Sequence, residues 1–295
     1  MLKKVNRLLK LVVYTNLWVA FAIASFTYLS LLEFQELPLN YILFVFCSTI
    51  GAYNYMRMVQ LPKELNEELN EDLNQKFWIS KRFIQAIFFT LLFLGLALYF
   101  YISIFSFQLL FATLPAFVVA LFYPLGFNQA FKSFSSLRNT PGLKLFLISI
   151  SWSYISFLMP QFVFAKIEAF SIYEFLFRTG LVAALVIPFD IRDMDLDSDE
   201  MQTLPQKIGA KRAKWVACVL MAIYIIWKWL HYLAFDGSQL LAISWLVSGL
   251  LGIWLISRMN SKRSELYCGF WVESIPIFTA LVLFVLSHWI ASGTF

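Results

Sequence analysis

The stretch Ile187-Pro-Phe-Asp-Ile-Arg-Asp-Met-Asp-Leu-Asp-Ser-Asp-Glu200 places five aspartates within ten residues, directly after a long apolar run. Acidic residues beside the hydrocarbon core of a membrane are costly and usually mark a functional site. If the stretch is helical, Asp190, Asp193 and Asp197 are spaced i, i+3 and i+7 and share one face. The spacing therefore predicts three carboxylates converging on one cavity wall.

Such a wall has the chemistry of a magnesium site. Mg²⁺ is a hard cation that takes oxygen ligands, keeps several waters and completes its shell with substrate phosphates. Asp195 and Asp199 point elsewhere on the same helix. The alternative is a solvated acidic loop at a helix end, but the spacing and the membrane context both favour ligands.

The composition is that of a membrane protein. Of the chain, 60% is hydrophobic, 19% aromatic and only 14% charged, whereas a soluble domain carries about 25% charged residues. The three cysteines are isolated from one another, so neither a disulfide framework nor a cysteine metal site is expected. Apolar runs long enough to span a bilayer lie at 8–32, 38–59, 82–103, 106–125, 143–165, 172–190, 213–235, 239–257 and 270–292. The sequence thus predicts a single all-α integral membrane domain, 1–295, with about nine transmembrane helices.

The distribution of basic residues predicts the orientation. Cytoplasmic loops of membrane proteins are rich in Lys and Arg. With the N-terminus in the cytoplasm, only Lys166, Arg178 and Lys228 of the 23 basic residues fall away from that side. We therefore expect the N-terminus and the acidic motif on the cytoplasmic side of a prokaryotic cytoplasmic membrane. The net charge of +5 then reflects topology and contact with anionic lipids, not nucleic-acid binding.

The loops on the predicted cytoplasmic side contain further candidates. Residues 60–78 carry leucines every four residues among acids, which is typical of an amphipathic helix on the membrane or over a cavity mouth. Arg138 and Lys144 flank a Pro-Gly turn and are candidate diphosphate contacts, because charge-assisted bonds to phosphate are strong. Both could equally be lipid anchors. The loop after the aspartates, through Lys214, adds four bases that either contact phosphate or simply follow the charge rule.

These residues resemble the UbiA superfamily of intramembrane prenyltransferases. Asp190-x-x-Asp193-x-x-x-Asp197, followed by Thr203-Leu-Pro-x-x-x-Gly209, is similar to the second aspartate-rich motif of that family and its trailing signature. The resemblance implies a helical bundle around a central cavity that opens sideways to lipid. It also implies Mg²⁺-assisted loss of diphosphate from a prenyl donor and attachment of the allylic cation to an aromatic or other lipid acceptor.

The chain departs from the family pattern at the position of the first aspartate-rich motif. Asn-Asp-x-x-Asp corresponds best to Asn54-Tyr-Met-Arg-Met58, where Asn54 is kept but Tyr55 and Met58 replace the acids. One of two acidic walls is therefore missing. Arg57 either pairs directly with a phosphate in place of a metal or anchors the end of the span.

The residues and the resemblance together predict an enzyme that transfers alkyl groups other than methyl. Asp190, Asp193 and Asp197 would bind Mg²⁺ and act in catalysis, and the substrate would be bound by Asn54, Arg57, Arg138 and Lys144. The substrates would be a prenyl diphosphate and a lipophilic, aromatic acceptor. A non-catalytic relative that binds or presents an isoprenoid lipid is the alternative, and a transporter is a weaker third. Glu273, a second intramembrane acid, either orients the acceptor or pairs with a base.

Overall fold

The computed structural model describes residues 2–33, 38–59, 82–124, 142–165, 167, 169–195, 201–234 and 238–291. Within these ranges the regular structure is helical throughout, with no strand. The amphipathic helix expected over 60–78, the candidate phosphate contact Arg138 and the candidate ligand Asp197 lie outside the described residues. The predicted all-α fold class is confirmed.

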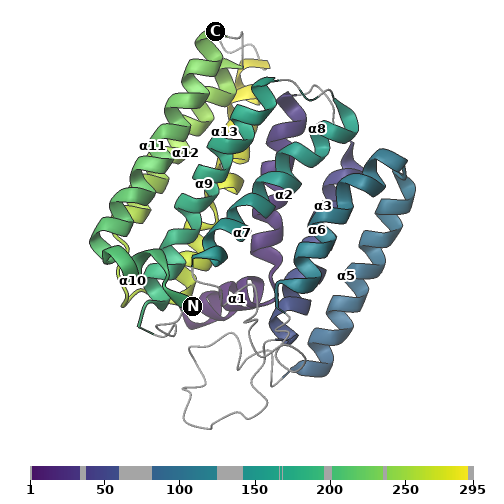
Figure 1. Cartoon of the computed structure of the whole chain (residues 1–295), viewed down its shortest axis with the longest axis horizontal. Coiled ribbons are helices and arrows are strands. Elements are labelled where there is room, and N and C mark those ends of the chain that lie inside the picture. Colours follow the sequence, from purple (N-terminus) through teal and green to yellow (C-terminus); the bar gives the residue numbers. More distant parts are fainter. Residues whose placement is uncertain are drawn as a thin grey trace.

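The helices form one bundle (Figure 1). Their bounds are α1 (Leu2–Tyr14), α2 (Leu17–Glu33), α3 (Leu39–Val59), α5 (Phe83–Ser103), α6 (Phe107–Phe122), α7 (Leu143–Ser153), α8 (Met159–Phe164), α9 (Ala169–Asp193), α10 (Leu204–Ile208), α11 (Ala210–Ala234), α12 (Gln239–Ser257) and α13 (Ile275–Ala291). Two π-helical segments interrupt the pattern: η2 (Tyr154–Leu158) joins α7 to α8, and η4 (Tyr267–Val272) leads into α13. Each of the nine predicted spans contains an apolar helix or a continuous helical run.

The number of membrane crossings agrees approximately with the prediction. Seven helical segments of the described chain are long and apolar enough to cross a membrane, and the bent pair of α1 and α2 brings an eighth. The ninth, α6, has 16 residues, or about 24 Å at 1.5 Å per residue, which is shorter than the hydrocarbon core of about 30 Å. The chain is an integral membrane protein.

The first span differs from the expected single helix over 8–32. The axis bends by 65° between α1 and α2, and α1 lies across the end of the bundle (Figure 1). Asn16, between the two helices, has a left-handed φ of 61°, which Asn tolerates better than most residues because its side chain can hydrogen-bond locally. We call this end of the bundle, where α1, the start of α7 and the last turn of α9 meet, the motif end.

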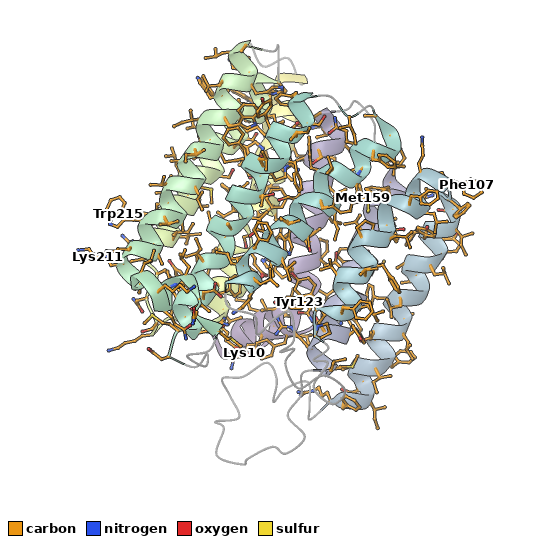
Figure 2. All side chains as sticks on the ribbon, in the orientation of Figure 1. Lys10, Phe107, Tyr123, Met159, Lys211 and Trp215 are labelled. Atoms are coloured by element: carbon orange, nitrogen blue, oxygen red, sulfur yellow. The ribbon has the colours of Figure 1, made fainter. Side chains whose placement is uncertain are left out.

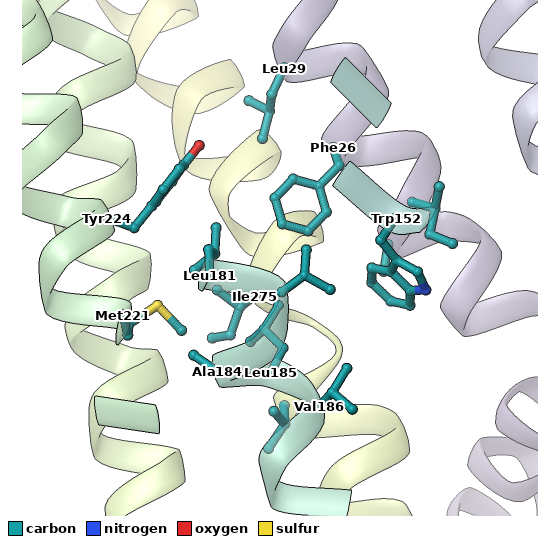
Figure 3. Packing of buried hydrophobic residues seen from close by; sticks show 14 of the residues in the cluster. Phe26, Leu29, Trp152, Leu181, Ala184, Leu185, Val186, Met221, Tyr224 and Ile275 are labelled. Atoms are coloured by element: carbon teal, nitrogen blue, oxygen red, sulfur yellow. The ribbon is translucent and has the colours of Figure 1, made fainter. Parts of the chain in front are cut away.

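The interior is filled by large apolar side chains. Figure 3 shows Phe26 of α2 and Leu185 of α9 facing the same core as Trp152 and Tyr224. Trp245, the largest fully buried side chain, stacks on Phe26 with ring centroids 5.7 Å apart. On the outside, large apolar side chains such as Phe107 and Trp215 project away from the bundle, as expected for a surface that faces lipid (Figure 2).

Four charged side chains are buried together in the half of the bundle away from the motif end. Arg178 Nη2 lies 3.0 Å from Glu174 Oε1. Lys228 Nζ lies 2.7 Å from Glu33 Oε1 and 2.8 Å from Glu174 Oε1. Arg178 and Lys228 are two of the three bases that break the predicted charge rule, and the structure explains them as partners of buried acids. The four charges, which we call the buried ion network, join α2, α9 and α11.

Candidate active site at the motif end

The last turn of α9 carries the described part of the acidic motif. Asp190 is 1% exposed, and its Oδ1 lies 2.9 Å from the Nζ of Lys144 at the start of α7. Asp193 accepts two hydrogen bonds from the neighbouring guanidinium of Arg192, at 2.7 and 2.8 Å. Both acids therefore have a basic partner, which offsets part of the cost of placing a carboxylate beside the membrane core.

Asp190 faces one of two cavities that flank this turn. The cavity, which we call the lysine cavity, has a volume of about 190 Å³ and is lined by Lys144, Lys207, Asp190 and Thr203, among others. Lys144 is carried there by the start of α7, where Gly142 adopts a φ of 70°. Glycine suits this position because a side chain would strain a left-handed backbone. The predicted site residues Asp190 and Lys144 are thus brought together.

The signature after the aspartates has a structural role in this arrangement. Thr203 is the N-cap of the short helix α10, and its backbone N–H donates to Gln206 Oε1 at 2.8 Å. Gly209 ends α10 with a φ of 82°, a conformation that favours glycine. The signature therefore forms a helical turn with a defined start and stop, which carries Lys207 and leads into α11.

A second cavity, which we call the arginine cavity, is lined by other residues of α9, Phe189 and Arg192. Its volume is about 80 Å³, and it lies between α1, α2, α3, α9 and η4. Its polar lining consists of Tyr14, Asn16, Tyr53, Arg57, Arg192, Glu265 and Glu273. Two guanidinium groups and two carboxylates thus share one small space. Sequence analysis indicated Arg57 and Glu273 but not that they lie at the same cavity.

Asn16 connects the elbow of α1 and α2 to α3. Its Nδ2 donates to Asn54 Oδ1 at 2.8 Å, and its Oδ1 accepts from Arg57 Nε at 3.1 Å. Asn54, a predicted substrate contact, is buried behind Asn16 instead of lining the arginine cavity. The sequence signal for Asn16 was an amide side chain in the otherwise apolar run that begins the first span.

The α3 side chains that face the arginine cavity differ from those expected at the first motif. Tyr53 and Arg57, one turn apart, line the cavity. Tyr55 points toward α6, where its hydroxyl donates to Leu121 O at 3.4 Å. The wall that α3 presents to the cavity is therefore an aromatic ring and a guanidinium.

The carboxylates at the end of α9 are of the ligand type that a magnesium ion takes together with a substrate. Asp190 and Asp193 supply carboxylate oxygens one helical turn apart, and Mg²⁺ is commonly held by one or two carboxylates plus substrate phosphates. Among the described residues no group of three His, Cys, Asp or Glu side chains could hold a metal on its own. Phosphate oxygens would have to complete the shell.

Comparison with solved structures agrees with this architecture. A UbiA homologue from Archaeoglobus fulgidus superposes with a TM-score of 0.61 at 14% identity, over 95% of this chain and 98% of that one. A UbiA homologue from Aeropyrum pernix gives a TM-score of 0.65 at 14% identity, over 91% of this chain and 98% of that one. The chain has the UbiA fold. No family model matches the sequence, and no curated protein matches it.

The likeness to UbiA homologues extends to a structure with ligands. The Archaeoglobus fulgidus homologue bound to DMAPP and Mg²⁺ superposes with a TM-score of 0.53 at 16% identity, over 95% of this chain and 97% of that one. The UbiA fold therefore accounts for nearly the whole chain, as the resemblance in sequence predicted.

Proposed function

We propose that the chain transfers a prenyl group from a prenyl diphosphate to a lipophilic, aromatic acceptor within the membrane. The observation that supports this most is the meeting of acids and bases from α3, α7 and α9 around the last turn of α9. The fold is shared with a UbiA homologue bound to DMAPP and Mg²⁺ and one bound to GPP and Mg²⁺. We further propose that the motif end faces the cytoplasm.

In this proposal the diphosphate binds at the end of α9. Asp190, Asp193 and, from its spacing, Asp197 would hold Mg²⁺, which when bound neutralises charge on the leaving diphosphate. Lys144 lines the lysine cavity and Arg57 lines the arginine cavity, and both cavities border the last turns of α9. Both can donate charge-assisted hydrogen bonds to phosphate oxygens. Arg138 completes the proposed substrate contacts, and Asn54 acts from behind Asn16, from which it accepts a hydrogen bond at 2.8 Å.

The aromatic residues that line the arginine cavity suit the allylic cation that the proposed reaction forms. Departure of diphosphate leaves an allylic cation that water would quench, so the reacting carbon needs a site that excludes water. Phe189 and Tyr53 line the cavity, and an aromatic face attracts a cation by about 0.5–2 kcal/mol.

One observation favours a different function. Because α3 presents Tyr53 and Arg57 in place of acids, only one acidic wall is present in the described site. A non-catalytic protein that binds or presents an isoprenoid lipid needs the bases but not two metal sites.

One experiment separates the two functions. The full-length protein in lipid nanodiscs is incubated with labelled geranyl diphosphate and Mg²⁺, and released inorganic diphosphate is measured against nanodiscs without protein. Release above background supports the transferase. Saturable binding of geranyl diphosphate without release supports the binding protein.

A further inference from the structure

Glu273 differs from the other acids that lie inside the described bundle. Glu33, Glu174, Asp190 and Asp193 each contact a basic side chain within 3.0 Å. No described residue forms a hydrogen bond with the Glu273 carboxylate, although it lines the arginine cavity. A carboxylate without such a bond in a membrane protein needs an explanation, because polar groups in protein interiors are nearly always paired.

The backbone before Glu273 has an unusual form that sets its position. Residues Tyr267–Val272 form the π-helical segment η4, and the Glu273 N–H donates to Cys268 O at 3.1 Å, five residues back. Each inserted residue turns the following side chains by about 100° relative to a regular α-helix. π-Helical turns are rare and occur frequently at functional sites.

Side chains from other helices stabilise this turn. Trp18 Nε1 on α2 donates to Phe270 O at 3.0 Å, and the Cys268 thiol donates to Pro188 O on α9 at 3.6 Å. The second contact joins η4 to α9 two residues before Asp190. The position of Glu273 is therefore fixed relative to the helix that carries the acidic motif.

Two basic side chains lie near the Glu273 carboxylate. Arg57 and Arg192 are the basic groups that interact electrostatically with Glu273, from α3 and α9. Glu265, the other acid of the cavity, is hydrogen-bonded to Tyr14. Glu273 is thus the cavity acid whose oxygens face two cations without a hydrogen bond from a described residue.

We propose that the arginine cavity holds the hydroxyl-bearing head of the acceptor and that Glu273 takes the proton from it. This rests on the proposed prenyl transfer. The C1–O bond of the prenyl diphosphate breaks, and diphosphate leaves with the electron pair. An oxygen lone pair of the acceptor hydroxyl forms the new C–O bond to C1. The hydroxyl proton passes to the Glu273 carboxylate, which later returns it to water.

The size of the cavity agrees with this role. One water needs about 10–15 Å³ by the same measure, so about 80 Å³ admits a small polar group. The apolar remainder of a lipid acceptor would then stay in the surrounding membrane. Tyr53, whose hydroxyl accepts from Trp152 Nε1 at 2.7 Å, and Phe189 form the less polar wall.

The test compares two products of one reaction. Full-length protein in nanodiscs is incubated with labelled geranyl diphosphate and Mg²⁺. A total lipid extract from the cells that produce the protein supplies the acceptor. Diphosphate release and label transferred to lipid are measured together. Glu273→Gln keeps the size of the side chain but cannot accept the proton. We expect its diphosphate release to stay within about 3-fold of the wild type while lipid labelling falls at least about 100-fold, within the range for general-base catalysis.

The matched control is Glu33→Gln, which removes a carboxylate of the buried ion network, outside both cavities, and should leave the ratio of transfer to release unchanged. The pH dependence gives a further readout. Transfer by the wild type should fall at low pH, where the carboxylate becomes protonated, and transfer by Glu273→Gln should not. The other titratable groups around Glu273 are kept in both proteins: Arg57, Arg192, Tyr53, Cys268, Tyr14 and Glu265.

The outcomes separate the two proposals. Equal lipid labelling by the wild type and Glu273→Gln overturns the role of Glu273 and leaves prenyl transfer standing. Equal loss in Glu273→Gln and Glu33→Gln overturns it as well, because a general effect of removing a buried carboxylate then explains the result. A wild-type protein that releases no diphosphate overturns the proposed function itself.

Discussion

Lys144 and Asp190 form an ion pair of 2.9 Å between the first turn of α7 and the last turn of α9. The carboxylate side chain is 1% exposed and the ammonium side chain 14%, so water reaches the base but hardly reaches the acid. The pair fixes the spacing of two helices at the point where the acidic motif begins. It also means that a substrate phosphate reaching Lys144 would compete with Asp190, which would free the carboxylate for a metal ion.

Because Asp190 is more deeply buried than Lys144, we expect removal of the two charges to lower stability by different amounts. Lys144→Met leaves a buried carboxylate without its base, and breaking a buried pair in this way costs about 3–5 kcal/mol. Asp190→Asn leaves the more accessible ammonium and should cost less. Reversible unfolding in mixed micelles should show this order, and the double variant should cost less than the sum of the two. Additive effects would show that the pair contributes no coupling energy.

The second prediction concerns the metal. Asp193 shares a predicted face with Asp190, whereas Asp199 does not. Asp193→Asn should therefore weaken the binding of geranyl diphosphate at saturating Mg²⁺ far more than Asp199→Asn does. A Mg²⁺ titration of each variant checks this, with chelator as the zero point. Identical titration curves for the two variants would remove Asp193 from the ligand set.

The sequence predicted the transmembrane spans but not the contacts between distant segments. Hydropathy located the spans well, because in lipid every backbone polar group must be satisfied within a helix and a spanning helix needs about 20 apolar residues. Charge bias flagged Arg178 and Lys228 as exceptions without revealing their partners. The pairing of Lys228 with Glu33 joins residues 195 positions apart, which no local pattern encodes.

The sequence predicted the candidate site only in part, because contacts between distant segments also decide which side chains meet there. Helical periodicity put Asp190 and Asp193 near one another on α9, but which neighbour each one faces depends on how α7 and η4 pack. The bend at Asn16 was missed because the apolar run continues through it without Gly or Pro. Tyr55 turned out to face α6 because the packing of α3, not its motif register, decides which side chains reach the cavity.

The third prediction separates the two interpretations of Arg57. If it contacts phosphate, Arg57→Ala should weaken geranyl diphosphate binding about 10- to 100-fold, the equivalent of a charge-assisted hydrogen bond worth about 1.5–3 kcal/mol. Arg82→Ala removes a base just before α5, away from both cavities, and serves as the control. Isothermal titration in detergent measures both. Similar affinities for the two variants would identify Arg57 as an anchor of the span end.

The fourth prediction tests topology. Charge bias places the N-terminus in the cytoplasm, and α1 and the end of α13 lie at opposite ends of the bundle (Figure 1). Reporter fusions at the two termini should therefore give opposite signals, with the N-terminal fusion cytoplasmic. Signals from the same side would contradict an odd number of crossings.

The last prediction concerns the buried ion network, which fixes α9 from the end opposite the motif. Glu174 contacts both Arg178 and Lys228, and Tyr224 and Trp227 also donate to its oxygens, at 2.9 and 2.7 Å. Glu174→Gln leaves two buried cations with only Glu33 to balance them. Removing one partner of a buried ionic group typically costs about 3–5 kcal/mol, so the variant should unfold at a clearly lower temperature.

A paired change should restore part of that loss. Glu174→Gln combined with Lys228→Met removes one acid and one base, so the net charge of the buried ion network returns to zero. Because a buried ion pair can often be replaced by neutral residues without loss of stability, the double variant should be more stable than Glu174→Gln alone. Glu33→Gln is a milder control, since Glu33 contacts only Lys228 among the network's bases. Thermal unfolding in the same detergent ranks the four proteins. A double variant less stable than Glu174→Gln would show that Lys228 stabilises the bundle through contacts other than these acids.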